Sequence, residues 1–397
     1  MDDRIQRLAN LIVDFGANIQ PGQLVDLAAD VGKEELTRAV AAGAYERGAK
    51  FVDVTYYDPH VKRARIERVR DESLEYIPPW FGQRVLELGR SHAASIYLAG
   101  PAAPHLFDDV DADRLGRDIY PRVKEWMHVI DDKTVNWCIA PCPTHAWATY
   151  VHGDLEADAA YERLWDEIVH ICRLDEPDPA AAWRERSGQL KRAAAKLNEL
   201  RFDALHFEGE GTDLTVGLLP TSRWSGGGDE TVDGVFHMAN LPTEEVYTAP
   251  DPERTHGTVR ATKPLVAYDV EIVGLRVRFD NGRAVEIEAE RGADTMRGFA
   301  SRDENACRLG EVSLVDRESR IGAMNTLFYD ILLDENAASH VAIGDAYKAT
   351  VDEPDYGRIN RSEIHLDFMI GGPGVDVTGL AADGTRVPVL RDGVWAI

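Results

Sequence analysis

Apolar and polar positions follow two different periods along this chain. Apolar residues recur at helical spacing, which predicts amphipathic helices, over 3–15, 33–47, 66–76, 115–129, 155–173 and 178–198. Short apolar runs that are typical of buried strands lie between the first of these segments, at 23–27, 49–56 and 94–98. Because strands and helices alternate, residues 1–200 are predicted to form an α/β domain with a largely parallel sheet.

The period of the hydrophobic pattern changes at about Arg201. From there, runs of alternating residues predict strands, and Asp280-Asn281-Gly282 is a strong hairpin turn with alternation on both sides. Helical spacing returns only briefly, from 301 onward and around 325–333. Residues 201–397 are therefore predicted to form a second, strand-rich α+β domain.

Candidate metal ligands gather in this second domain. In an extended strand, residues two apart point the same way, so His365 and Asp367 would present an imidazole and a carboxylate to one place. Upstream lie His340, Glu311 and Glu245. Carboxylates and imidazoles together suit Zn, Co, Mn or Fe, and a carboxylate can bridge two ions. The pattern predicts a metal-binding catalytic domain.

Each of these residues also has an ordinary structural explanation. His365 alone is more often a hydrogen-bonded core histidine, and His340 would be favourable as a cation at a helix C-terminus. Asp367 and Glu311, however, lie in apolar runs where an unpaired carboxylate is costly. The structural explanation holds for each residue singly and is poor for the whole set.

Composition narrows the class of protein. The chain has 397 residues, 44% of them hydrophobic, which is enough for a large core and two domains. Its formal net charge of −25 argues against a nucleic-acid partner, because phosphate binding needs clustered Lys and Arg. The apolar runs are short and interrupted by charge, so no membrane span is expected. No signal-peptide pattern opens the chain, which favours a cytoplasmic enzyme.

The cysteines add little chemistry. Four scattered cysteines in a chain of this length make no disulfide framework. Cys138 and Cys142, followed by His145, suggest a zinc site, but the spacing is unusual and no second Cys/His pair follows. Packed free thiols are the prediction.

Six sequence blocks carry a resemblance to a known family. They read GTDLTVGL (211–218), NLPTEEVYTAPDPERTHGTV (240–259), ATKPL (261–265), LGEVSLV (309–315), LFYDILLDENAASHVAIGDAY (327–347) and HLDFMIGGPGVDVTG (365–379). With these blocks the chain resembles the M29 family of metalloaminopeptidases, the thermophilic aminopeptidase T type. The resemblance extends over essentially the whole chain and is most specific from Gly211 onward.

The resemblance implies roles for particular residues. The implied metal ligands are Glu245, Glu311, His340, His365 and Asp367, with Glu311 also catalytic. Tyr347, seven residues after His340, matches the family tyrosine that reaches the metal site. One departure is the segment of 25 positions from His340 to His365, which is shorter than expected and would reshape the rim of the site.

The expected activity is removal of the N-terminal residue from small peptides. Two divalent ions per chain, drawn from Zn, Co, Mn or Mg, would share a hydroxide and polarise the scissile carbonyl. One ion would bind the free α-amine, and the Tyr347 hydroxyl would donate to the oxyanion. The resemblance also implies a homodimer whose active sites open into an enclosed space.

Two other functions compete with this interpretation. Ring-opening dihydroxypyridine dioxygenases resemble the same scaffold and hold one Fe with a His, His, Asp set, which here would be His340, His365 and Asp367. Glu245 and Glu311 favour the two-metal hydrolase, because a mononuclear iron site needs neither. A non-catalytic scaffold protein is disfavoured, since that role would not require a complete ligand set.

The sequence leaves the roles of some neighbouring residues open. Lys263 either contacts substrate or is an ordinary strand-end lysine, and Glu244 is better interpreted as a supporting carboxylate than as a catalytic one. Trp224 and Tyr247 either line the pocket or lie in the core. His237 and His256 have no partner at ligand spacing. The first domain has no GxGxxG or Walker motif, so its role is predicted to be structural.

Overall fold

The computed structural model describes every residue except 1, 119, 122, 268 and 269, and it divides into two compact units. The first unit comprises Met1–Ser187 and Gly228–Thr243, and the second comprises Gly188–Gly227 and Glu244–Ile397. The division falls inside the long helix α9 (Pro179–Leu200). The domain boundary at residue 200 stays a prediction about independent folding, which limited proteolysis would test.

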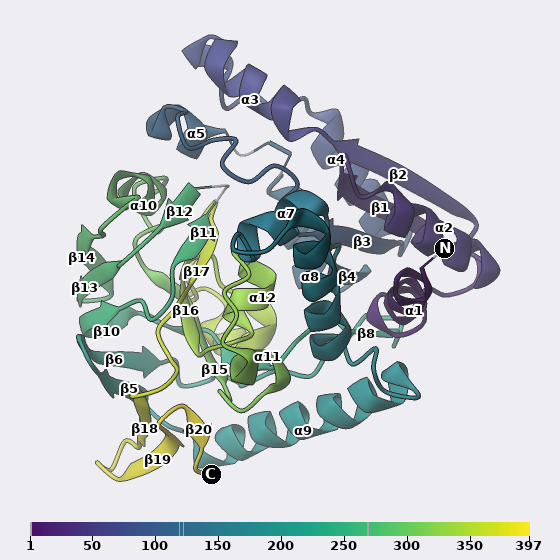
Figure 1. Cartoon of the computed structure of the whole chain (residues 1–397). Helices are drawn as coiled ribbons and strands as arrows, with labels where there is room; N and C mark the ends of the chain where they lie inside the picture. Colours follow the sequence, from purple (N-terminus) through teal and green to yellow (C-terminus); the bar gives the residue numbers. More distant parts are fainter. Residues whose placement is uncertain (1, 119, 122, 268–269) are drawn as a thin grey trace. The chain divides into compact units, whose positions relative to one another are not determined.

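The first unit is an α/β structure (Figure 1). Its four strands pair in parallel in the order β2-β1-β3-β4. The strands are β1 (Leu24–Asp30), β2 (Phe51–Tyr57), β3 (Ala94–Ala99) and β4 (Asn136–Pro141), with the short β7 (Asp229–Glu230) and β8 (Phe236–His237) apart from them. The helices are α1 (Asp3–Leu11), η1 (Ile12–Gly16), α2 (Glu34–Glu46), α3 (Pro59–Arg68), η2 (Asp71–Ser73), α4 (Trp80–Arg90), α5 (Ala112–Arg117), α6 (Glu125–Asp131), α7 (His145–Val151) and α8 (Ala157–Ile171). The predicted parallel sheet is confirmed.

Two helix predictions in this unit are wrong in detail. The helix expected over 66–76 is α3, which begins earlier because the Asp58 side chain accepts the His60 N–H and Pro59 starts the first turn. The segment expected as one helix over 115–129 holds the separate helices α5 and α6, and its positions 119 and 122 lie outside the described residues. Strand β4 and helix α4 were not predicted.

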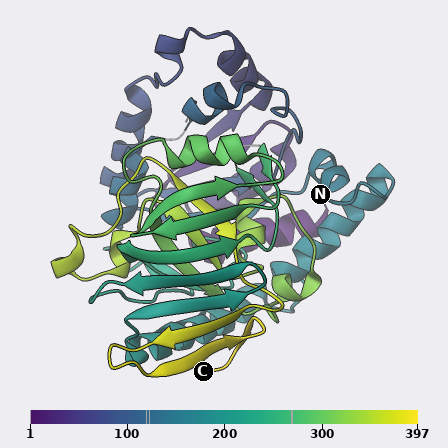
Figure 2. The same cartoon turned by 90° about the vertical axis from the view of Figure 1, so that its left-hand side faces the viewer.

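Two antiparallel sheets dominate the second unit. The larger one has the strand order β14-β13-β10-β6-β5-β18-β19-β20, and the smaller one β17-β16-β15-β9. Figure 2 shows the strands of the larger sheet side by side, from green to the yellow C-terminal strands. The strands of the larger sheet are β5 (Ala204–Gly209), β6 (Thr212–Leu218), β10 (Pro250–Arg260), β13 (Arg276–Asp280), β14 (Arg283–Glu288), β18 (Asp376–Leu380), β19 (Arg386–Arg391) and β20 (Val394–Trp395). Together with the first unit, this strand-rich architecture confirms the predicted fold class.

The smaller sheet and the helices complete the second unit. The strands of the smaller sheet are β9 (Glu245–Thr248), β15 (Leu309–Val315), β16 (His340–Gly344) and β17 (His365–Met369). A separate two-stranded sheet pairs β11 (Leu265–Ala267) with β12 (Val270–Ile272). The short helices are α10 (Ala293–Ala300), α11 (Arg320–Met324), α12 (Ile331–Glu335), η3 (Lys348–Thr350) and η4 (Glu353–Asp355). Helix α10 ends at Ala300, just before the position from which a helix was expected. The helix expected over 325–333 is replaced by the shorter helices α11 and α12. Within the described part of the chain, no helix is long and apolar enough to span a membrane.

Alternation along the strands gives the two faces of the smaller sheet different kinds of side chain. Residues two apart share a face of a strand. The apolar positions form one face, which belongs to the main hydrophobic core: Val246, Val312, Leu314, Val341, Ile343, Leu366 and Phe368. The residues between them point to the opposite face, and they include every ligand candidate named from the sequence. One sheet therefore has a packed apolar side and a side that carries charged groups.

Truncating the apolar side should destabilise the sheet. Phe368 is fully buried between Asp367 and Met369, so Phe368→Ala leaves a cavity. We expect a loss of about 3–5 kcal/mol in the free energy of unfolding, measured by urea denaturation. The control is Val285→Ala on β14, which is 47% exposed and should change stability by no more than about 0.5 kcal/mol. Equal effects of the two variants would contradict this account of the core.

Candidate metal centre

All four strands of the smaller sheet contribute to one cluster of charged side chains. Strand pairing places His340 opposite Ser313, Val315 opposite Glu245, and Asp367 opposite Ala342. Directly paired residues share a face. Glu311 lies two positions from Ser313, and His365 lies two from Asp367, so both join the same face. The structure therefore brings together all five ligand candidates, which span 123 positions of sequence from Glu245 to Asp367.

Two carboxylates in this cluster each span the two histidines. Glu311 places Oε1 3.6 Å from Nε2 of His340 and Oε2 3.7 Å from Nε2 of His365. Asp367 places Oδ1 4.0 Å from Nε2 of His340 and Oδ2 3.4 Å from Nε2 of His365. Glu245 lies on one side only, with Oε2 3.1 Å from His340 Nε2. The donors thus form two neighbouring groups that share Glu311 and Asp367.

Main-chain carbonyls fix the orientation of both histidine rings. Nδ1 of His340 lies 3.1 Å from the Ala338 carbonyl oxygen, and Nδ1 of His365 lies 2.8 Å from that of Asp345. A carbonyl only accepts, so each Nδ1 carries the donated proton and each Nε2 faces the carboxylates. In a neutral ring this leaves the Nε2 lone pair for a metal ion, as in carbonyl-supported histidine ligands of metalloenzymes.

A further carboxylate of the site was missed in the sequence. Glu335 ends helix α12, is buried, and interacts electrostatically with Asp367, Glu245, His340 and Glu311. Burial, followed by the charges of Asp367 and Glu245, holds the pKa of Glu335 well above its usual value. Its signal was the acidic pair Asp334-Glu335, which directly follows Leu332 and Leu333 and ends five positions before His340.

The donor set fits divalent cations. Glu245, Glu311 and His340 present ligand atoms that all lie within 4.8 Å of one another. Oδ1 of Asp367 is buried and accepts no hydrogen bond, which is costly unless a cation lies against it. Four buried carboxylates here carry four negative charges if all are ionised, and two divalent ions would balance them. Burial also raises the pKa of Glu311.

Tyr347 lies beside the charged cluster. Its ring centroid is 5.4 Å from that of His365 and 6.0 Å from that of Tyr247. Burial, and then the charge of Glu311, raise the pKa of the Tyr347 phenol well above its usual value. The hydroxyl therefore keeps its proton and remains a hydrogen-bond donor. Tyr247 shares the face of Glu245, whereas Trp224 belongs to the hydrophobic core.

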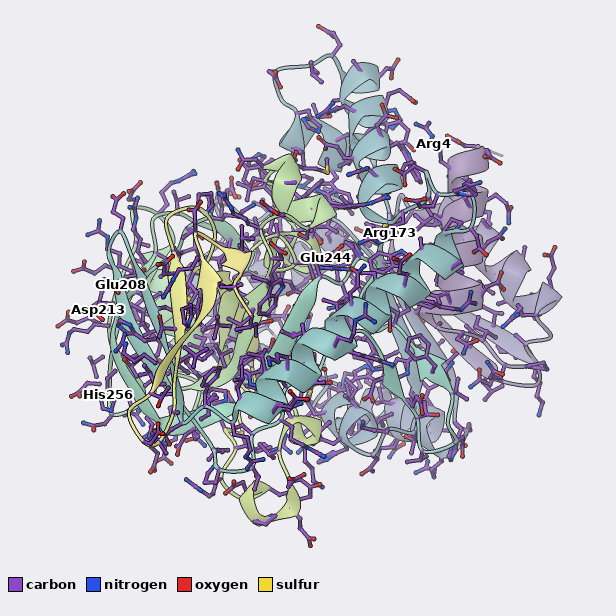
Figure 3. The ribbon with its side chains drawn as sticks, turned by 90° about the horizontal axis from the view of Figure 1, so that it is seen from below. Arg4, Arg173, Glu208, Asp213, Glu244 and His256 are labelled. Carbon is purple, nitrogen blue, oxygen red and sulfur yellow. The ribbon has the colours of Figure 1, made fainter. Side chains whose placement is uncertain are left out.

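Other residues that the sequence drew attention to lie outside the cluster. Burial lowers the pKa of the half-buried Lys263, and the charge of Asp334 acts against that shift. Glu244 is buried, and its main-chain N–H donates to Oδ1 of Asn336 at 2.7 Å. Figure 3 shows His256 at the margin of the second unit. All four cysteines are buried free thiols, which confirms the prediction made for them: Cys138, Cys142, Cys172 and Cys307.

Comparisons with known proteins point to one family. The profile of the family described as thermophilic metalloprotease (M29) matches residues 1–395. Aminopeptidase T of Thermus aquaticus is 38% identical over 100% of this chain and 99% of the relative. Aminopeptidase AmpS of Bacillus subtilis is 35% identical over 100% of both chains. The structure of wild-type AmpT from Thermus thermophilus superposes with a TM-score of 0.89 at 36% identity, covering 99% of each chain.

Proposed function

The chain belongs to the M29 family of metallopeptidases, and on that premise we propose that it removes the N-terminal residue from peptides with two divalent metal ions. The observation that carries the two-metal proposal is the pair of carboxylates, Glu311 and Asp367, that each reach both histidines. A mononuclear site would use both histidines with one carboxylate and would leave the remaining buried carboxylates without an ion. Two groups of donors that share two bridging carboxylates match a two-metal site.

We assign the donors to two positions. Glu245 and His340 would hold one ion, His365 would hold the other, and Glu311 and Asp367 would bridge them. Zn, Co, Mn or Mg are the candidates, since oxygen and imidazole donors suit these ions. Bound ions would supply Lewis-acid polarisation of the scissile carbonyl and activation of a water molecule.

Two side chains of the protein would take part in the reaction beside the metal ions. Glu335 would transfer the proton: bound cations would lower its pKa, so that its carboxylate could accept a proton from the attacking water and return it to the leaving amine nitrogen. The Tyr347 hydroxyl donates a hydrogen bond to the oxygen of the scissile carbonyl as negative charge develops on it. One bound ion would hold the free α-amine of a peptide substrate, so that free N-termini would be selected.

Metal removal tests the proposal directly. Protein purified without added metal should contain about two Zn, Co or Mn ions per chain by elemental analysis. Dialysis against a chelator should reduce the hydrolysis of leucine p-nitroanilide to background, and adding the metal back should restore it. A chain that hydrolyses this substrate fully after complete removal of metal would contradict the mechanism.

The ring-cleaving dioxygenase alternative gains no support from these comparisons. The relatives named above are aminopeptidases, and a mononuclear iron site would leave Glu245 and Glu335 buried without a role. One Fe per chain without peptidase activity would reverse this preference. Assembly as a homodimer, suggested by the resemblance alone, is part of the proposal, and so is a cytoplasmic location. Light scattering on the purified chain would measure the dimer.

A further inference from the structure

One hydroxyl lies against the ligand candidates without being a ligand candidate itself. Ser313 lies on β15, directly opposite His340 and two positions after Glu311, on the charged face of the smaller sheet. It is fully buried. Its Oγ lies 2.6 Å from Oε2 of Glu245 and 3.5 Å from the Val246 carbonyl oxygen. A hydroxyl has one proton, so the shorter contact identifies the Glu245 carboxylate as the acceptor.

The main chain before Glu245 is held separately. Asn336, also fully buried, accepts the Glu244 N–H with Oδ1 at 2.7 Å and donates from Nδ2 to the Leu332 carbonyl at 2.9 Å. The same Nδ2 lies 3.4 Å from Oε1 of Glu335. The start of β9 is therefore tied to the end of α12. The freedom that remains to Glu245 is rotation of its own side chain.

We infer that Ser313 is a positioning residue that holds the Glu245 carboxylate for one of the two metal positions. This inference rests on the proposed two-metal site. A hydrogen bond to a ligating carboxylate fixes its rotamer before the ion arrives and strengthens the site. Among the described residues, the Ser313 hydroxyl hydrogen-bonds to Glu245 and to no other ligand candidate. Its effect should therefore fall on the position formed by Glu245 and His340, and spare the one at His365.

Because Ser313 should affect only one of the two metal positions, the two binding affinities test the inference. Ser313→Ala should weaken the binding of one of the two Zn or Mn ions by at least about tenfold and leave the other unchanged, in a titration of the metal-free chain against a chromophoric chelator. Ser313→Thr keeps the hydroxyl and should restore the wild-type titration. A purely structural role would lower both affinities together, or neither.

A matched control lies on the other face of the same sheet. Thr248 on β9 is fully buried and donates from Oγ1 to the Arg223 carbonyl at 2.9 Å. Thr248→Val removes a fully buried hydroxyl from the opposite face of the sheet and should lower thermal stability while leaving both metal affinities intact. If Thr248→Val weakens one ion as Ser313→Ala does, the effect is not specific to Glu245 and the inference is overturned.

Failure of this inference can be told apart from failure of the proposed function. Two ions on the wild-type chain with an unchanged Ser313→Ala titration would reject the positioning role and leave the two-metal site standing. A wild-type chain that binds one ion or none would reject the two-metal site itself. Selective loss of one ion in Ser313→Ala, restored in Ser313→Thr, supports the positioning role.

Discussion

Replacing Glu311 by glutamine should abolish both the second metal ion and most of the activity. The variant keeps the size of the side chain and removes one carboxylate oxygen. In the structure that carboxylate reaches His340 with one oxygen and His365 with the other. In the proposed two-metal site Glu311 would bridge both ions, so its loss should remove several kcal/mol of transition-state stabilisation. We expect kcat/KM on leucine p-nitroanilide to fall by about 10³-fold or more.

The metal content decides how that loss is interpreted. Elemental analysis of Glu311→Gln should show fewer than two ions per chain, with circular dichroism unchanged. Glu253→Gln on β10 is the matched control, because Glu253 is exposed on the larger sheet and should keep full activity and metal. Full metal content and wild-type kcat/KM in Glu311→Gln would remove Glu311 from the site.

Strand alternation predicts only part of the candidate cluster, and the resemblance to the M29 family implied the complete set of five candidates. His365 and Asp367 are two apart, as are Glu311 and Ser313, and their neighbours are apolar residues of the core face. Period-two alternation is a local rule, so it identifies which residues face the same way. It does not show which strands pair. The convergence of the ligands follows from the antiparallel pairing of β9, β15, β16 and β17.

Glu335 shows where that local rule ends. It is the last residue of α12, a five-residue helix, and neither the strand period nor a full helical repeat applies to it. Its place in the site depends on how α12 packs against β17, which is a contact between distant segments. The acidic pair Asp334-Glu335 in an apolar setting was the available signal. Both residues are buried, and burial raises the pKa of Asp334 to about 7.

The first unit illustrates the same limit for secondary structure. Helices with a strong apolar stripe, such as α1 and α2, were predicted well. Helix α3 has one buried residue, Ile66, and its start depends on the Asp58 cap rather than on periodicity. Strand β4 contains Trp137 and Cys138 between Asn136 and Pro141, which is a weak strand pattern. Its place at the sheet edge depends on pairing with β3.

Replacing Tyr347 by phenylalanine should lower the rate without removing the metal. The variant keeps the ring that packs near His365 and Tyr247, and it removes only the hydroxyl. Loss of one donor to a developing oxyanion typically costs about 10²–10³-fold in kcat. We expect that loss in kcat with little change in KM, because the hydrogen bond forms mainly in the transition state. Elemental analysis should give the wild-type metal content.

Tyr247 provides the matched control for this prediction. It lies on the same face as Glu245, and its ring centroid is 6.0 Å from that of Tyr347, so Tyr247→Phe makes the same chemical change beside the site. A loss of kcat in Tyr347→Phe alone assigns the donated hydrogen bond to one phenol. Equal losses in both variants would indicate a general effect of polarity near the metals. Unchanged kcat in Tyr347→Phe would require the oxyanion to be stabilised by other groups, and Tyr347 would then be a packing residue of the site.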